Sequence, residues 1–223
     1  MRPDTLRLLA LACTALLAAC PAPSSTLDSG TGGGGGTLED GGSTSDFGIS
    51  AKGVVRFKRN ERLTIDFGNA LGLPYDTLCK ELGLYSCSIF VHPLALGGVD
   101  PYGSGLYEPL PFTGVTSPIA VDRVALAGCS QRVKADLETP ASAVIFKGMT
   151  VVDGKVDPAS PAAQTALDTL YKRALQRPPT QSELAHLASL NAEIVASGKP
   201  EPGKAWLTLS CFAVLTSVES LFY

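Results

Sequence analysis

The stretch AWLTLSCFAVLTSVESLFY, residues 205–223, carries apolar side chains on nearly all sides of a helix. Such a helix has no face for solvent, so we expect it at the centre of a helical bundle, beginning near Lys204. The apolar positions are Trp206, Leu207, Leu209, Phe212, Val214, Leu215, Val218, Leu221 and Phe222.

Three amphipathic segments upstream are expected to surround this helix. Pro118 and Pro161 each occupy a favoured first helical position, and Thr180 with Glu183 forms a capping box. The segments run over 117–138, from 161 to the RPPT sequence, and from 180 to Gly198. The inward stripe expected for the first comprises Ile119, Leu126, Cys129, Val133 and Leu137.

The N-terminal half of the folded part contains shorter elements. Residues 60–73 fit either a strand or a helix, and we favour a helix because Asn60 can cap it and Gly72 can end it. A short helix is expected over 76–82, with short strands at 52–58 and 143–146. The predicted fold class is therefore mainly α: a small helical bundle with a long Gly/Pro-rich ordered loop and one or two short strands.

The first 19 residues are typical of an export signal. Two arginines precede the apolar run 8–19, which is too short to span a bilayer as a helix. The sequence LAAC, ending at Cys20, resembles the bacterial lipobox, which implies that Cys20 is lipidated and becomes the mature N-terminus. Pro21 in place of Asp then favours the outer membrane. The alternative is plain secretion with an incidental cysteine.

Residues 20–50 are expected to be the lipidated N-terminus and a flexible tether, and 51–223 a disulfide-bridged helical domain. The tether is rich in Gly, Ser, Thr and Pro, a composition that cannot bury enough apolar surface to fold. The run Gly32–Gly36 is no phosphate loop, because no strand precedes it and no Lys-Ser/Thr follows it.

The charge balance argues against a nucleic-acid partner. The formal net charge is −3, whereas nucleic-acid binders carry a basic patch. One basic cluster, KRNER at 58–62, is expected to be a solvated face, with a phosphate or lipid-headgroup site as the alternative.

Four cysteines remain once Cys13 leaves with the signal and Cys20 is lipidated. An even number in an exported chain indicates two disulfides. We predict Cys79–Cys87 across a turn and Cys129–Cys211 between the inward faces of two apolar helices, with free buried cysteines as the alternative.

Chemical motifs are lacking in this sequence. Cys79, Cys87 and His92 do not have the spacing of a zinc site, and there is no haem motif, G-x-S-x-G elbow or H-E-x-x-H. We therefore expect no cofactor and no metal. Residues 83–116 are the best candidate for a binding surface, with His92, Tyr102 and Tyr107 as its candidate residues, because long ordered loops are often functional.

The sequences at 170–187 and 205–223 resemble a helical module of bacterial envelope proteins of unknown function. Its pattern is L-Y-x-R-x-L-x-R-x-P-T-x-x-E-L, followed by an apolar helix ending S-x-E-F-L-F; here Ser220 replaces the Phe. RLTIDFGNALGL at 62–73 is similar to the module's early helix. Some members carry cytochrome c modules, but this chain lacks the haem motif, so the resemblance implies no activity.

Glu219 is an acid within a strongly apolar segment. A buried ion pair with Arg173 or Arg177, which lie four residues apart on one helix, would explain it. The functional expectation is a non-catalytic interaction or structural module, anchored in the cell envelope and meeting an envelope protein. The alternative is an envelope enzyme or a sugar- or peptidoglycan-binding protein that uses the 83–116 loop. A third hypothesis is a small cofactor-binding protein.

Overall fold

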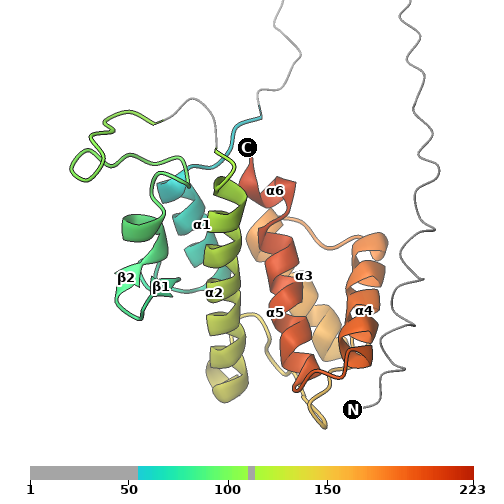
Figure 1. The fold of residues 1–223 in the computed structure, drawn as a ribbon. Helices are drawn as coiled ribbons and strands as arrows, with labels where there is room; N and C mark the ends of the chain where they lie inside the picture. The colour runs from blue at the N-terminus through green and yellow to red at the C-terminus, as the bar shows by residue number, and fades with distance from the viewer. Residues whose placement is uncertain (1–54, 110–113) are drawn as a thin grey trace, which may run out of the picture. The chain divides into compact units, whose positions relative to one another are not determined.

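The helix α5, Pro202–Leu215, packs chiefly against three long helices in the computed structural model, which describes residues 55–109 and 114–223 (Figure 1). Its neighbours are α2 (Ser117–Glu138), α3 (Pro161–Leu175) and α4 (Gln181–Ala196). Trp206 and Leu207 are fully buried, and the Trp206 indole N–H donates to the Leu187 carbonyl of α4 at 2.7 Å. The mainly helical fold and the central position of this helix are confirmed.

The apolar C-terminal stretch does not form one continuous helix. Helix α5 ends at Leu215, and Ser217 starts the short α6, Val218–Leu221, by accepting a hydrogen bond from the Ser220 N–H. A serine hydroxyl competes for backbone groups in this way and favours helix starts. The expectation of a single helix was therefore wrong beyond Leu215.

The end of the chain pairs with the segment that leads into the first helix. The Arg56 N–H donates to the Tyr223 carbonyl at 2.9 Å, and the Lys58 N–H donates to the Leu221 carbonyl at 2.8 Å. Phe57 and Phe222 form an isolated antiparallel bridge, with their rings packed edge to face. Where a strand was expected at 52–58, residues 55–58 thus form only this isolated bridge. Residues 52–54 lie outside the described ranges.

Helix α1, Asn60–Leu71, follows as expected and ends at Gly72, which has a left-handed backbone (φ 63°). Two arginines contact carbonyl groups of its last turn. Arg173 of α3 donates to the Asn69 and Ala70 carbonyls, each at 2.6 Å, and Arg132 of α2 lies 3.5 Å from the Leu71 carbonyl. Cations suit the negative end of a helix, so these contacts join α1 to α2 and α3.

Helix α2 buries only part of the predicted stripe, with Leu137 half-buried against the core. Ile119 and Leu126 are exposed, whereas Cys129 and Val133 are buried. The buried face is built largely from small residues, which let α1 and α5 approach closely. At Gly128 an added Cβ would lie 2.8 Å from the Leu71 side chain. The largest apolar side chains of α2 therefore do not mark its buried face.

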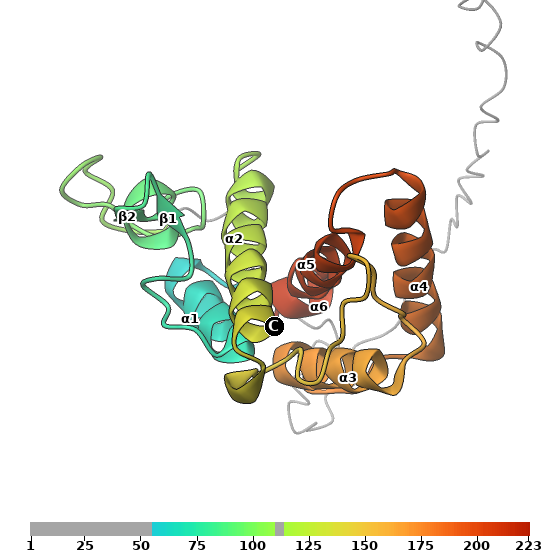
Figure 2. The same ribbon diagram turned by 90° about the horizontal axis from the view of Figure 1, so that it is seen from below.

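Residues 76–82 form turns and a strand instead of the predicted short helix. Strands β1 (Lys80–Glu81) and β2 (Tyr85–Ser86) make an antiparallel hairpin, followed by the π-helix η2, Cys87–Val91. Leu82 and Gly83 both have positive φ, as a tight turn requires. The hairpin and α4 lie at opposite ends of the row of helices (Figures 1 and 2).

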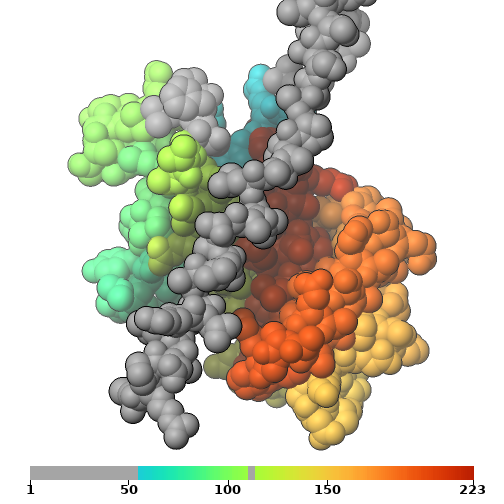
Figure 3. Space-filling model, turned by 45° about the vertical axis from the view of Figure 1, so that its right-hand side comes forward, coloured from blue at the N-terminus to red at the C-terminus, as the bar shows by residue number. Residues whose placement is uncertain are grey.

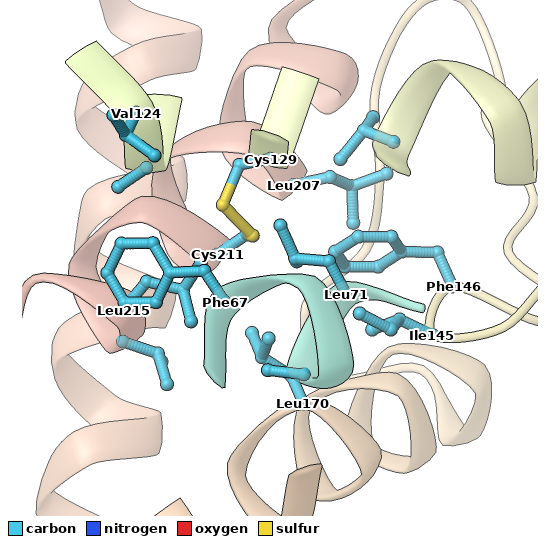
Figure 4. Packing of buried hydrophobic residues seen from close by; sticks show 14 of the residues in the cluster. Phe67, Leu71, Val124, Cys129, Ile145, Phe146, Leu170, Leu207, Cys211 and Leu215 are labelled. Atoms are coloured by element: carbon cyan, nitrogen blue, oxygen red, sulfur yellow. A yellow bond between two sulfur atoms is a disulfide. The ribbon is translucent and has the colours of Figure 1, made fainter. Parts of the chain in front are cut away.

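The segment after α2 is irregular where a strand was predicted at 143–146. After the short helix η3, Pro140–Ser142, the buried Asp136 carboxylate accepts hydrogen bonds from the N–H groups of Val144, Ile145 and Phe146, each at 2.9 Å. It also pairs with Arg132 at 2.8 Å. These bonds satisfy the backbone without a partner strand and place Ile145 and Phe146 in the core (Figure 4).

Candidate functional site

Two disulfides join the four cysteines of the folded part, with the predicted pairing. Cys129–Cys211 links α2 to α5 inside the core (Figure 4). Cys79–Cys87 closes the hairpin across eight positions. The expected lipidation site, Cys20, the export signal and the tether lie outside the described residues.

His92 belongs to a small polar cluster that connects the hairpin to α2. Glu81 of β1 pairs with Arg123 at 2.7 Å, and His92 Nε2 lies 3.5 Å from the same carboxylate oxygen. The His92 backbone N–H donates to the Cys87 carbonyl at 2.7 Å and so closes η2. These contacts give His92 a place in the structure of the hairpin.

The two candidate tyrosines lie on the outside of the following loop. A bridge between Asp100 and Leu106 closes this loop, and Tyr102 at its tip is 99% exposed. Tyr107 is exposed too, whereas His92 is half-buried against Glu81. The structure therefore does not gather the three predicted residues in one enclosed site.

The hairpin instead presents large apolar side chains to solvent. We call the group Leu82, Leu84, Tyr85, Phe90 and Val91 the hairpin surface. Leu82 is 89% exposed and Phe90 is 70% exposed, and in Figure 3 the green region that contains the hairpin lies at one edge of the domain. Exposed apolar groups that cluster mark interaction sites. A sequence signal was present, because leucines flank the turn glycine in ELGLYS.

The predicted ion pair of Glu219 forms with Arg177, not with Arg173. The Arg177 guanidinium bridges Glu219 at 2.8 Å and Glu183 at 2.7 Å, and its Cζ lies 5.6 Å from the Tyr171 ring centre. The pair is not buried, since the Glu219 side chain is 47% exposed. The expectation of burial was wrong because α5 ends before Glu219, which leaves this residue on the short outer helix α6.

Glu183 has a second role at the start of α4. Its carboxylate accepts hydrogen bonds from the Thr180 N–H at 2.7 Å, and the Thr180 hydroxyl accepts from the Glu183 N–H, so the predicted capping box is confirmed. The Arg177 guanidinium, helped by Thr180, holds the pKa of Glu183 at about 2, below its ordinary value. Arg177, through its contacts with Tyr171, Glu183 and Glu219, therefore joins α3, α4 and α6.

No family model, curated protein or solved structure matches this chain. Within residues 55–109 and 114–223, no three metal-binding side chains converge. In the same part of the chain, no helix has both the length and the apolar character needed to cross a bilayer. The functional evidence therefore rests on the residues themselves.

Proposed function

We propose that the protein is a lipid-anchored, non-catalytic interaction module of the bacterial cell envelope. Lipidation of Cys20 would supply the anchor, and outer-membrane sorting follows from the residue after it. About 30 residues of Gly/Ser-rich tether give a reach of roughly 30 Å. The domain then presents its hairpin surface to a second envelope protein.

The exposed hairpin surface is the observation that supports this proposal. Aromatic side chains such as Tyr85 and Phe90 are enriched in protein interfaces. The Cys79–Cys87 disulfide and the contacts of Glu81 hold the hairpin in place, so little order has to be gained on binding.

Site-specific photo-crosslinking in intact cells tests the interface. A crosslinker at Phe90 should trap one discrete protein, whereas one at Val218, which is also 70% exposed but lies on α6, should not. Adding Leu84→Asp should abolish the adduct at position 90. Adducts with lipid only, or equal protein adducts from both positions, would contradict the proposed interface.

Fractionation of cells tests the anchor separately. Cys20→Ala should move the protein from the membrane to a soluble fraction, because the acyl chains account for stable attachment. Retention of the variant on the membrane, as firmly as the wild type, would contradict lipidation at this residue.

A second candidate function is glycan binding at a pocket beside the 83–116 loop. This pocket of about 430 Å³ is lined by Asn60, Glu61 and Tyr75, among others, and the Asn60 Oδ1 atom is buried without a hydrogen-bond partner in the described structure. Unpaired buried acceptors invite a polar ligand, and a tyrosine ring can stack on a sugar. Titration with soluble peptidoglycan fragments should give a signal that Tyr75→Ala removes; no signal with wild type would exclude these fragments as ligands.

A further inference from the structure

A polar pocket of about 370 Å³ lies on another part of the domain, where α1, the end of α3 and α6 meet. The basic cluster at 58–62 contributes Lys58 and Arg62 to its wall, and α3 contributes Arg173. Asp66 is the acidic residue of the wall. Ser220 of α6, near the end of the chain, also lines the pocket and has a buried side chain. The wall therefore carries three cationic groups and one carboxylate.

The cations are already oriented within the folded chain. Lys58 Nζ lies 3.1 Å from Asp66, and the Arg62 Nε atom lies 3.1 Å from each oxygen of the same carboxylate. Arg173 is fixed by its two bonds to carbonyl groups of α1. Because Asp66 engages one nitrogen of Arg62, and the α1 carbonyls engage two nitrogens of Arg173, each guanidinium keeps donors for a ligand.

The remaining charges near the pocket do not cancel the excess of cationic side chains over the one carboxylate. The C-terminal ends of α1 and α3 contribute about half a negative charge each, which leaves an excess of roughly one positive charge. Glu219 precedes Ser220 but is bound to Arg177. An anion is therefore the ligand that the pocket favours.

The number and origin of the donors distinguish between kinds of anion. Lys58 and Arg62 from the 58–62 cluster, Arg173 from α3 and Ser220 from α6 line the same pocket, so its polar groups come from three parts of the chain. A planar carboxylate has two acceptor oxygens in one plane, whereas a tetrahedral phosphate can accept hydrogen bonds from donors on several sides. Guanidinium groups also bind phosphate in a favourable geometry.

We propose that this pocket binds the phosphate group of a small phosphorylated ligand or of a lipid headgroup. Lys58 and Arg62 donate hydrogen bonds to the phosphate as well as to Asp66, and Arg173 adds a donor that is already held in place. The short side chain of Ser220 leaves space in the pocket for the phosphate. This site is independent of the hairpin surface and of the interface proposed there.

Calorimetric titration of the full chain with inorganic phosphate, at constant ionic strength, tests the site. Arg62→Gln should weaken binding by about 10-fold or more, and Ser220→Phe should remove it by filling the pocket. Asp66→Asn should tighten binding by about 2- to 5-fold, because it releases two cations. Lys172→Gln is the matched control, since Lys172 lies on α3 away from the pocket, paired with Asp168, and it should change little.

Equal affinity of wild type and Arg62→Gln, or weaker binding by Asp66→Asn, would overturn the proposal. Arg62 is a largely exposed side chain, so its replacement is expected to leave folding intact, as an unchanged melting temperature would show. Failure of wild type to bind phosphate would overturn it too.

Vesicles distinguish the two sources of phosphate. The Cys20→Ala chain, which carries no acyl anchor, is mixed with phosphatidylcholine vesicles with and without phosphatidylglycerol. Binding that needs phosphatidylglycerol and is lost in Arg62→Gln supports a headgroup ligand. Phosphate binding without vesicle binding supports a soluble phosphorylated ligand. Vesicle binding that Arg62→Gln leaves unchanged argues against the pocket as a headgroup site.

Discussion

The two disulfides should stabilise the domain by different amounts. A crosslink stabilises a protein mainly by restricting its unfolded chain, and the effect grows with the length of the closed loop. The bridge Cys129–Cys211 spans 82 positions and Cys79–Cys87 spans eight. The chain-entropy relation gives about 4.5 kcal/mol for the long loop and about 2.5 kcal/mol for the short one.

Two double variants, with both cysteines of one bridge changed to alanine, test this difference. Each removes two sulfur atoms from sites that are buried, so the comparison isolates the length of the loop. For a domain of this size we expect the melting temperature to fall by about 9–18 °C without Cys129–Cys211 and by about 5–10 °C without Cys79–Cys87. Denaturant unfolding followed by circular dichroism measures the free energies directly. Equal losses of stability, or a larger loss from the short bridge, would contradict an effect that grows with loop length.

Three further predictions concern acidic side chains. Glu183 has its pKa lowered to about 2 in the folded state from an ordinary 4.5, so the stability it contributes is present above pH 4.5 and is lost as the pH falls toward 2; stability curves of Glu183→Gln should be flatter in that window. Asp136→Asn should lower the free energy of unfolding by about 3–5 kcal/mol, because it breaks a buried ion pair with Arg132. The control Glu138→Gln, on the exposed end of α2, should leave the melting temperature unchanged. Glu219→Gln should lower the free energy of unfolding by about 1 kcal/mol or less, because its ion pair is exposed. A loss near that of Asp136→Asn would mean that the pair contributes as a buried one does.

The helical part of the fold follows from local sequence signals. Pro161, Thr180 with Glu183, and Gly72 start or end helices by interactions within a few residues, and such interactions can be recognised in one sequence. The cysteine pairing was predictable for a related reason, since only helix faces and a turn had to be known.

Long-range contacts account for the errors. The course of residues 143–146 depends on Asp136, whose carboxylate replaces a neighbouring strand, and nothing in the local sequence shows that bond. The buried face of α2 depends on how closely Leu71 of α1 and the following Leu78 approach it at Gly128. The polar pocket beside α1 likewise combines residues more than 150 positions apart, so the cluster at 58–62 by itself predicted a solvated face.

The pairing of Arg56 and Lys58 with the last three residues has a mechanical consequence. The chain enters the domain at the place where residues 221–223 lie against it. Any pull transmitted from residues 1–54 therefore acts first on this pair of short segments, and only afterwards on α1. The edge-to-face contact of Phe57 with Phe222 would be among the first contacts to resist unfolding when force is applied to the chain before residue 55.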